Sequence, residues 1–304
     1  MPELPEVETT RRGIAPVLEG RRIAALVVRE TRLRWPVPRT LADEIAGQSV
    51  NAVRRRAKYL LIDLERGSLI LHLGMSGSVR VLPPDTPLID HDHIDILLDS
   101  GLALRFNDPR RFGSLLWTRA DPLTHPLLER LAPEPLEDAF SGEYLYAASR
   151  GRRVAIKQLL MNSHVVVGVG NIYASEALFR ARIHPRRAAG RLTRVQMAKL
   201  ARAIKRVLAT AIRAGGTTLR DYVGTDGNPG YFRQKLYVYE RTGKPCRVCR
   251  TPIRQFTQGQ RSTYYCPDCQ GEGRLAKKVS TSPIPSRRRA DRRPPRLSAT
   301  RNPR

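Results

Sequence analysis

The first half of the chain carries its apolar residues in short runs. Between residues 22 and 118 these runs are rich in Val, Ile and Leu, as in Arg22–Val28 and Ser68–Leu73, and Gly, Pro and Asp separate them. Short apolar stretches bounded by turn-forming residues are typical of β-strands. The pattern therefore favours a β-sandwich or barrel for this part of the chain.

A helical pattern replaces the strand pattern after the proline-rich segment 132–135. Segments with helical character occupy residues 141–150, 153–161, 171–182 and 193–214. In the last segment the apolar residues recur mostly every four positions, which gives one apolar stripe with basic residues off it. The predicted stripe consists of Val195, Leu200, Ile204, Leu208 and Ile212.

These patterns predict an α+β protein with several domains. We expect an N-terminal β-sandwich domain with an N-terminal helix at 1–133, a helical domain at 134–235, a cysteine-containing module at 236–271 and a tail at 275–304. A Gly- and Asp-containing stretch at 217–232 is predicted to be a mobile recognition loop. The tail consists mainly of Pro, Ser and Arg, so we expect it to be disordered.

The charge balance indicates a polyanionic partner. The 304 residues include 54 Lys and Arg against 28 Asp and Glu, which leaves a net charge of +26. Nucleic acid is the best match to such a surface. An anionic membrane is the competing partner, but the sequence contains neither a spanning apolar stretch nor a clear basic amphipathic anchor. Because the acidic, proline-broken start is unlike a signal peptide, we expect a cytoplasmic protein.

All four cysteines lie in one short segment with the spacing of a metal site. Two Cys-x2-Cys pairs flank an insert of 16 residues. This arrangement matches a tetrahedral zinc site with four thiolates, whereas disulfides fit a reducing compartment poorly. Such a site has no open coordination position, so the zinc is expected to be structural and the chemistry to lie elsewhere. The predicted ligands are Cys246, Cys249, Cys266 and Cys269.

The N-terminus is the candidate for that chemistry. Pro2 permits removal of Met1, and a free α-amino group has an ordinary pKa of about 7.7 to 8.0, so a useful fraction is neutral at pH 7. Its secondary amine can attack C1′ of a sugar and form an iminium, which acidifies the C2′ proton and prepares loss of the 3′ phosphate. Glu3 and Glu6 supply carboxyl groups for proton transfer. Alternatively, Pro2 and Glu3 only open a helix.

Six segments together resemble one family. Over residues 2 to about 270 the chain resembles the formamidopyrimidine-DNA glycosylases, which include the bacterial 8-oxoguanine glycosylases. The segments follow the family's order and comprise Pro2–Thr9, Arg55–Leu60, His72–Gly77, Asp108–Gly113, Val167–Glu176 and the four-cysteine finger. The resemblance implies a helix-two-turn-helix element in the helical domain, one structural Zn²⁺, damaged double-stranded DNA as partner, and a nucleoid-associated monomer without a nucleotide cofactor.

The resemblance also implies catalytic roles. Pro2 matches the Schiff-base nucleophile and Glu3 the general acid/base, while Lys58 matches the lysine assigned to β-elimination. Arg261, between the two cysteine pairs, matches the arginine linked to δ-elimination and to gripping phosphate. Without the resemblance, Lys58 would be interpreted as a solvated lysine on a basic strand.

Further matched residues are expected to contact DNA. An enzyme that acts on a base within a duplex must extrude that base and fill the gap. Met75, Arg110 and Phe112 match the residues that fill the gap in the family, and His91 and Arg152 match other DNA contacts. In the alternative interpretation, Met75 and Phe112 are core residues and Arg152 belongs to a solvated helix start.

The segment 168–173 places glycines before a predicted helix. A dinucleotide fingerprint is excluded, because Tyr173 stands where its third glycine belongs. Instead Asn171 is predicted to cap the helix, whose N-terminus is suited to bind phosphate. Glu176 matches a family carboxylate that supports the site, as we also expect of Glu6. The alternative for Glu176 is an acidic residue of the first helical turn, favoured by the helix dipole.

These observations predict a bifunctional DNA glycosylase and AP lyase of base excision repair. It would remove oxidised purines, chiefly 8-oxoguanine and formamidopyrimidines, and nick the abasic site by β,δ-elimination. Two alternatives stay open: an endonuclease VIII-like glycosylase for oxidised pyrimidines, and a non-catalytic zinc-dependent DNA-binding protein. Leu4, Val7, the gap-filling set and the 217–232 loop favour the purine enzyme.

Overall fold

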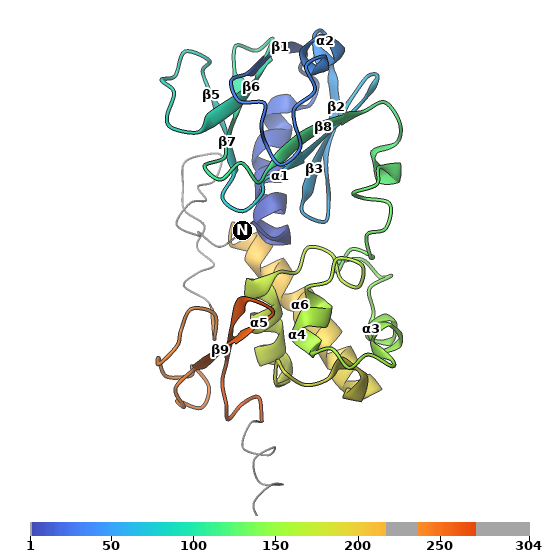
Figure 1. Cartoon of the computed structure of the whole chain (residues 1–304), viewed down its shortest axis with the longest axis vertical. Coiled ribbons are helices and arrows are strands. Elements are labelled where there is room, and N and C mark those ends of the chain that lie inside the picture. Colours follow the sequence, from blue (N-terminus) through green and yellow to red (C-terminus); the bar gives the residue numbers. More distant parts are fainter. Residues whose placement is uncertain (1, 217–235, 272–304) are drawn as a thin grey trace, which may run out of the picture.

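The computed structural model describes residues 2–216 and 236–271. Two β-sheets form the N-terminal half, helices form the second half, and a β-hairpin beside the four cysteines packs against these helices (Figure 1). The predicted fold class is therefore confirmed. The predicted loop at 217–232 and the tail at 275–304 lie outside the described residues. Within the described part, no helix is long and apolar enough to cross a membrane.

The N-terminal half is a sandwich of two antiparallel four-stranded sheets. One sheet has the strand order β1-β6-β7-β5 and the other has the order β2-β3-β4-β8. Apolar residues from both sheets, such as Ile62 and Phe106, meet in one buried core. The strands are β1 (Ile23–Val28), β2 (Val50–Arg56), β3 (Tyr59–Leu64), β4 (Gly67–His72), β5 (Ser78–Leu82), β6 (Asp92–Leu98), β7 (Ala103–Asn107) and β8 (Ser114–Thr118). The prediction that short apolar runs form strands is thus confirmed, since the runs Arg22–Val28 and Ser68–Leu73 correspond to β1 and β4.

Helix α1 (Leu4–Leu18) connects the two halves of the molecule. Val7, Ile14 and Leu18 pack into the sandwich core. The helix also contacts α6 (Arg194–Arg213) of the second half. Its N-terminal end therefore lies at the junction of the two halves (Figure 1).

The second half is built from the helices that the sequence predicts. They are α3 (Gly142–Ser149), α4 (Ile156–Leu160), α5 (Asn171–Ala181) and α6, and they share one core. The shorter helical elements are α2 (Leu41–Ile45), η1 (Pro122–Thr124) and η2 (Ala189–Arg191).

The predicted stripe of α6 is wrong at one position. Val195 is 76% exposed, whereas Leu200, Ile204, Leu208 and Ile212 are buried. Val195 lies five residues before Leu200, which is about 140° around the helix, so its side chain points away from the core.

A small third core holds the cysteine module against the helices. Val238 and Ile253 pack with two of the cysteines onto Phe179 of α5. Strands β9 (Arg254–Gln258) and β10 (Arg261–Tyr265) form a hairpin in which Arg261 pairs with Gln258. The two turn residues between them both have positive φ, the geometry that matches the twist of a two-residue hairpin.

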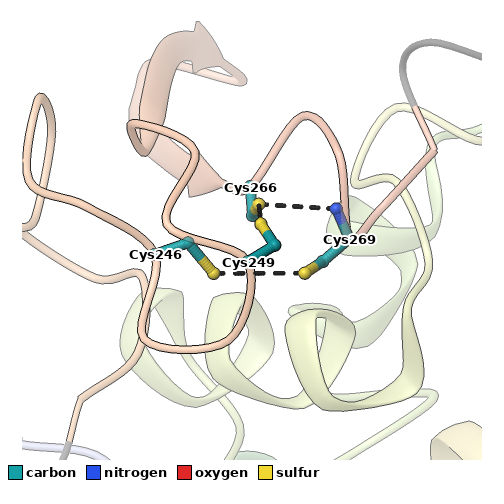
Figure 2. Close-up of side chains that lie close together, drawn as sticks. All are labelled: Cys246, Cys249, Cys266 and Cys269. Carbon is teal, nitrogen blue, oxygen red and sulfur yellow. Dashed lines mark hydrogen bonds between the residues drawn. The ribbon is translucent and has the colours of Figure 1, made fainter.

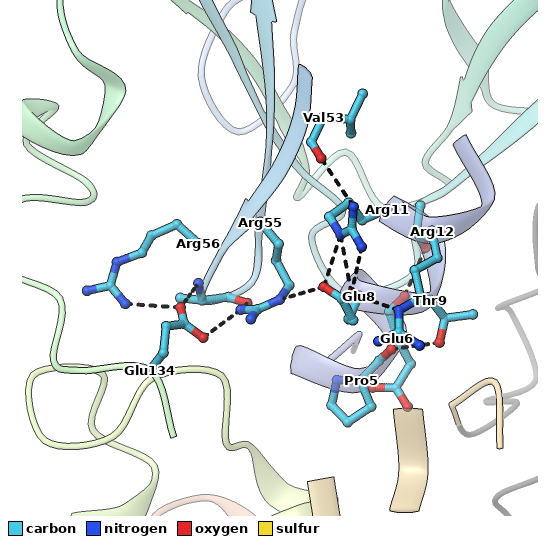
Figure 3. A network of polar contacts seen from close by, with 12 residues as sticks. Pro5, Glu6, Glu8, Thr9, Arg11, Arg12, Val53, Arg55, Arg56 and Glu134 are labelled. Carbon is cyan, nitrogen blue, oxygen red and sulfur yellow. Dashed lines mark hydrogen bonds and ion pairs between the residues drawn. The ribbon is translucent and has the colours of Figure 1, made fainter. Parts of the chain in front are cut away.

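A buried carboxylate ties the sandwich to the segment that leads into the helices. Glu134 accepts hydrogen bonds from the backbone N of Ala57 at 2.6 Å and from the side chains of Arg55 at 2.7 Å and Arg56 at 3.0 Å (Figure 3). Arg55 also pairs with Glu8 of α1 at 3.1 Å. These contacts fix the turn between β2 and β3.

Replacing this carboxylate should destabilise the sandwich. Glu134→Ala leaves the buried N–H of Ala57 without its acceptor and removes one carboxylate partner from two largely buried guanidinium groups, so we expect the free energy of unfolding to fall by about 3 kcal/mol. Urea denaturation followed by tryptophan fluorescence measures this, since both tryptophans lie in the N-terminal half. The matched control is Glu143→Ala, because Glu143 pairs with Arg194 on the exposed surface and should contribute little. Equal unfolding midpoints for the two variants would contradict the prediction.

Candidate functional site

Pro2 and Glu3 lie at the N-terminus of α5, where the carboxylate of Glu3 is bound. Glu3 is 2% exposed, and its two carboxylate oxygens accept hydrogen bonds from the backbone N of Gly170 at 2.6 Å, Ile172 at 2.9 Å and Tyr173 at 3.4 Å. Pro2, also buried, directly precedes it. The first turn of α5 therefore fixes the position of the N-terminal residues.

This contact corrects two predictions about α5. Asn171 is the first helical residue and not the cap, and the position before it is Gly170. The helix N-terminus binds the Glu3 carboxylate, where the sequence suggested a phosphate. The physical reason is the same in both cases, because unpaired N–H groups and the helix dipole favour an anion.

The glycines before α5 are required by close packing against the N-terminal residues. A Cβ on Gly170 would lie 2.4 Å from Cδ of Glu3, and a Cβ on Gly168, whose φ is +74°, would lie 2.5 Å from Cβ of Leu4. The backbone N of Leu4 also donates to the carbonyl of Gly168 at 3.0 Å. Any larger residue at either position would push the two segments apart.

Burial shifts the proton affinity of the carboxyl group. Burial raises the pKa of Glu3, and the neighbouring Glu6 acts in the same direction, whereas Lys58 and the backbone N–H groups oppose the shift. Glu6 itself accepts from the backbone N of Glu3 at 2.9 Å and from the hydroxyl of Tyr173 at 2.6 Å. Glu6 therefore holds the first turn of α1 against α5.

Lys58 reaches the same region from the tight turn between β2 and β3. Ala57, the residue before it, has a φ of +54°, and Arg56 pairs directly with Tyr59 across the turn. Burial lowers the pKa of Lys58, the charge of Glu3 opposes this shift, and Arg261 reinforces it. Three sequence-predicted residues from distant parts of the chain are thus close enough to influence one another electrostatically.

A buried lysine that the sequence analysis missed completes this cluster. Nζ of Lys157, on α4, donates to Oδ1 of Asn171 at 2.5 Å, to Oγ1 of Thr263 at 2.7 Å and to the carbonyl of Ser262 at 3.2 Å. Burial lowers its pKa to about 8; Arg261 acts in the same direction and the charge of Glu3 opposes it. The available signal was one cation within the apolar run of residues 154–160.

Asn171 links α5 to the cysteine hairpin. Its Nδ2 donates to the carbonyl of Ser262 at 3.0 Å, while its Oδ1 receives the Lys157 hydrogen bond. Arg261 follows the hairpin turn and its side chain is exposed. The hairpin that carries Arg261 is therefore anchored to both α4 and α5.

Glu176 does not lie in the first turn of α5, where the alternative interpretation placed it. It lies in the second turn of α5, is buried, and accepts hydrogen bonds from three consecutive backbone N–H groups at distances of 2.9 to 3.1 Å. The donors belong to Tyr237, Val238 and Tyr239. Glu176 thus holds the segment that leads into the cysteine module.

The predicted gap-filling residues lie on two loops of the sandwich that contact each other. Met75 and Phe112 are 36% and 44% exposed, so they are not core residues. The guanidinium of Arg110 lies 4.8 Å from the centre of the Phe112 ring. A Cβ on Gly74 would lie 2.5 Å from the backbone N of Gly113, which shows how closely the two loops pack.

Asp108 organises the second of these loops and joins it to His91. Its carboxylate accepts from the backbone N of Gly113 at 2.7 Å, and its own backbone N donates to the carbonyl of His91 at 3.1 Å. His91 is exposed and has a φ of +71°. Arg152 is exposed as well, but it lies in the turn between α3 and α4, on the other half of the molecule.

The four cysteines converge into one cluster. Their sulfur atoms all lie within 4.8 Å of one another, and none of the cysteines forms a disulfide (Figure 2). A tetrahedral zinc with bonds of about 2.3 Å needs sulfur atoms about 3.8 Å apart. The pairs Cys246–Cys269 and Cys249–Cys266, at 4.0 Å and 3.4 Å, bracket this value. The donor set fits one structural zinc ion, as predicted.

Three family models match successive parts of the chain. They describe the formamidopyrimidine-DNA glycosylase N-terminal domain at residues 1–115, the formamidopyrimidine-DNA glycosylase H2TH domain at 131–223, and a zinc finger found in FPG and IleRS at 243–271. Together they span the sandwich, the helical half and the cysteine module.

Individual proteins are similar over the same length. The chain is 62% identical to the formamidopyrimidine-DNA glycosylase of Thioalkalivibrio sulfidiphilus and 60% identical to that of Pseudomonas putida, in each case over 89% of this chain and 100% of the relative. The solved Thermus thermophilus protein is 40% identical, with a TM-score of 0.80 over 89% of this chain and 99% of its own. A Lactococcus lactis enzyme variant bound to Fapy-dG containing DNA is 31% identical, with a TM-score of 0.84 over 89% and 100%. Sequence identity, domain order and fold agree, and the chain therefore belongs to the formamidopyrimidine-DNA glycosylase family.

Proposed function

We propose that this protein is a bifunctional DNA glycosylase and AP lyase of base excision repair, which removes oxidised purines from duplex DNA and nicks the abasic site. Family membership supports the proposal, and so does the net charge of +26. Similar Lactococcus lactis structures hold Fapy-dG containing DNA and DNA with an abasic site. Because the substrate is DNA, the protein acts at the nucleoid in the cytoplasm. It acts as a monomer without a nucleotide cofactor, since one chain supplies every proposed site residue.

The observation that carries the proposal is the placement of the N-terminal residues. Glu3 is bound at the N-terminus of α5 and lies within electrostatic reach of Lys58. Pro2 directly precedes Glu3, so removal of Met1 would expose a secondary amine beside a buried carboxyl group and a lysine. These three groups are the ones that amine-based base removal and elimination need.

The proposed reaction begins at the Pro2 nitrogen. Its lone pair forms a bond to C1′ while the bond between C1′ and the damaged base breaks, and the amine gives up its proton. The C1′–O4′ bond then breaks as O4′ takes a proton, and the resulting iminium ion acidifies the proton on C2′. Loss of that proton expels the 3′ phosphate, and a second elimination expels the 5′ phosphate. The raised pKa of Glu3 suits it to deliver a proton and take it back, and the lowered pKa of Lys58 suits it to accept the C2′ proton.

The exposed loops supply the contacts that base extrusion requires. Met75 and Phe112 offer apolar surface that can replace stacking, and Arg110 can donate hydrogen bonds to the orphaned base. We propose that His91 and Arg152 contact the DNA backbone, one from each half of the molecule.

The second half of the proposed site depends on the cysteine hairpin. Arg261 would grip phosphate during the second elimination, and its hairpin is held by Asn171 and Lys157. We propose that Asn171, which these internal bonds hold at the start of α5, also contacts the DNA. Lys157 acts as a positioning residue, and Glu176 and Glu6 act by holding segments in place.

The nucleophile can be identified by borohydride trapping on 8-oxoguanine duplex DNA. We expect the wild-type adduct on the peptide that begins at Pro2, and Pro2→Gly should reduce trapping at least tenfold because a primary amine gives a less electrophilic imine. Pro5→Ala is the matched control, since it removes a proline from the same turn and should still form the adduct. An adduct on a lysine-containing peptide would contradict the prediction. Binding without any adduct would identify a non-catalytic DNA-binding protein, and stronger trapping on thymine glycol DNA an enzyme for oxidised pyrimidines.

The buried lysine should make stability depend on pH in the alkaline range. The pKa of Lys157 is about 8 in the folded protein and ordinarily 10.5, so between these values the unfolded chain binds more protons. The contribution of Lys157 to the free energy of unfolding must therefore rise from about pH 8 to about pH 10.5. Urea denaturation should show the difference between wild type and Lys157→Met growing in favour of the wild type over this range. The exposed Lys244→Met should show no such trend, and a constant difference for Lys157→Met would overturn the assignment.

Removing zinc should weaken DNA binding without unfolding the sandwich. Without the metal the four thiols no longer hold the module, and the hairpin contacts to Asn171 and Lys157 are lost, so we expect DNA affinity to fall about tenfold or more. Fluorescence anisotropy with duplex DNA before and after chelation measures this. Tryptophan fluorescence should stay unchanged, and added Zn²⁺ should restore binding. Unchanged affinity after chelation would contradict the prediction.

A further inference from the structure

A cavity of about 560 Å³ opens where the cysteine module meets the helical half, on a part of the molecule that the proposed site does not use. Its walls come from the C-terminal end of α5, the middle of α6 and residues beside the zinc cluster, including Tyr237 and Val248. Glu3 binds the opposite end of α5, and eleven residues of helix separate the two ends by about 16 Å. The cavity is therefore distinct from the proposed catalytic centre.

The walls of this cavity are strongly basic. Five of its lining residues are cations, and none is acidic. In the described part of the chain, four of these cations have no hydrogen bond, ion pair or aromatic ring as a partner of their side chains. Surface arginines such as Arg54, paired with Asp63, and Arg119, paired with Glu44, differ in this respect. The cationic lining residues are Arg180, Arg182, Lys199, Arg202 and Arg206, and all but Arg180 belong to the unpaired group.

The fold itself explains only part of this charge. Arg180 and Arg182 lie at the C-terminal end of α5, where the helix dipole favours cations. Lys199, Arg202 and Arg206 lie in the middle of α6, spaced three and four residues apart, so they share one face of the helix without any dipole benefit. Their mutual repulsion is an energetic cost that a bound anion would relieve.

The floor of the cavity strengthens the field of these charges. Phe179 and Ala203 line it with apolar side chains, and Tyr237 is covered by Phe179 at 5.4 Å and by Arg180 at 4.7 Å. A concave site with low-dielectric walls and charges of one sign concentrates counter-ions. Because the Tyr237 ring already packs with Phe179 and with the guanidinium groups of Arg180 and Arg247, the cavity suits phosphate groups better than a stacked base.

We propose that this cavity binds backbone phosphates of a second nucleic-acid segment while the first segment occupies the proposed catalytic site. The volume exceeds that of a single phosphate group, and the three exposed arginines converge from two helices as contacts to adjacent phosphates require. The protein thereby holds two duplex segments at once, one at each end of α5. This inference goes beyond base removal and does not depend on the Pro2 chemistry.

The test uses the full-length, zinc-loaded protein with its first site filled. A duplex with an uncleavable abasic analogue is added in equimolar amount, and a labelled undamaged duplex is then titrated in while its fluorescence anisotropy is followed. The pocket variant is Arg182→Gln, Arg202→Gln and Arg206→Gln combined. Its matched control, Arg21→Gln, Arg39→Gln and Arg66→Gln, loses the same charge from exposed positions on the sandwich.

We expect wild type and control to bind the second duplex, and the pocket variant to bind it at least tenfold more weakly. The slope of log affinity against log salt concentration should fall by about 2 to 3 in the pocket variant, since each contacted phosphate contributes about 0.9. Single-turnover excision should be equal in all three proteins, which separates this inference from the proposed function. Equal second-duplex binding by the pocket variant and wild type would overturn the inference. Displacement of the duplex by an equally charged polyglutamate peptide at lower concentration would overturn the nucleic-acid assignment in favour of an acidic protein segment.

Discussion

The arrangement of this molecule depends on one carboxylate bound by one helix N-terminus. The first N–H groups of α5 have no partner within the helix, and Glu3 accepts three of them in a buried setting. Because α1 packs into the sandwich core and α5 into the helical core, this contact fixes the N-terminal residues relative to both halves. Gly168 and Gly170 permit it, since a side chain at either position would occupy the space that Leu4 and Glu3 fill.

Burial of unlike charges around this contact prepares the proposed chemistry. The same desolvation raises the pKa of Glu3 and lowers those of Lys58 and Lys157. The pKa values of the acid and of the two bases therefore shift toward each other. At the other end of α5 the situation differs, because no acidic residue lines the cavity and four of its five cations are exposed to solvent. One helix thus separates a charge-balanced site from a purely cationic one.

Much of the fold could be predicted from local patterns. Apolar runs gave the strands of the sandwich, helical periodicity gave α3 to α6, and the cysteine spacing gave the zinc cluster, because each of these signals lies within a few consecutive turns or within one short segment. The exposed Val195 shows the limit of such patterns, since the phase of a stripe decides burial and one residue of error turns a side chain by about 100°. The matched motifs also singled out Pro2, Glu3, Lys58 and Arg261 as candidate site residues without any distance being known, and their roles stay predictions.

What the sequence determined by itself was the set of elements and the identity of the chemical groups. Only the tertiary structure decided their partners: that Glu3, and not a phosphate, occupies the N-terminus of α5, that Asn171 binds Lys157 and the hairpin and does not cap its helix, and that Glu176 holds residues 237–239. Each of these contacts joins residues 14 to 170 positions apart. Spacing along the chain carries no information on such pairs, because burial and the need to satisfy buried polar groups select them only when the halves pack together.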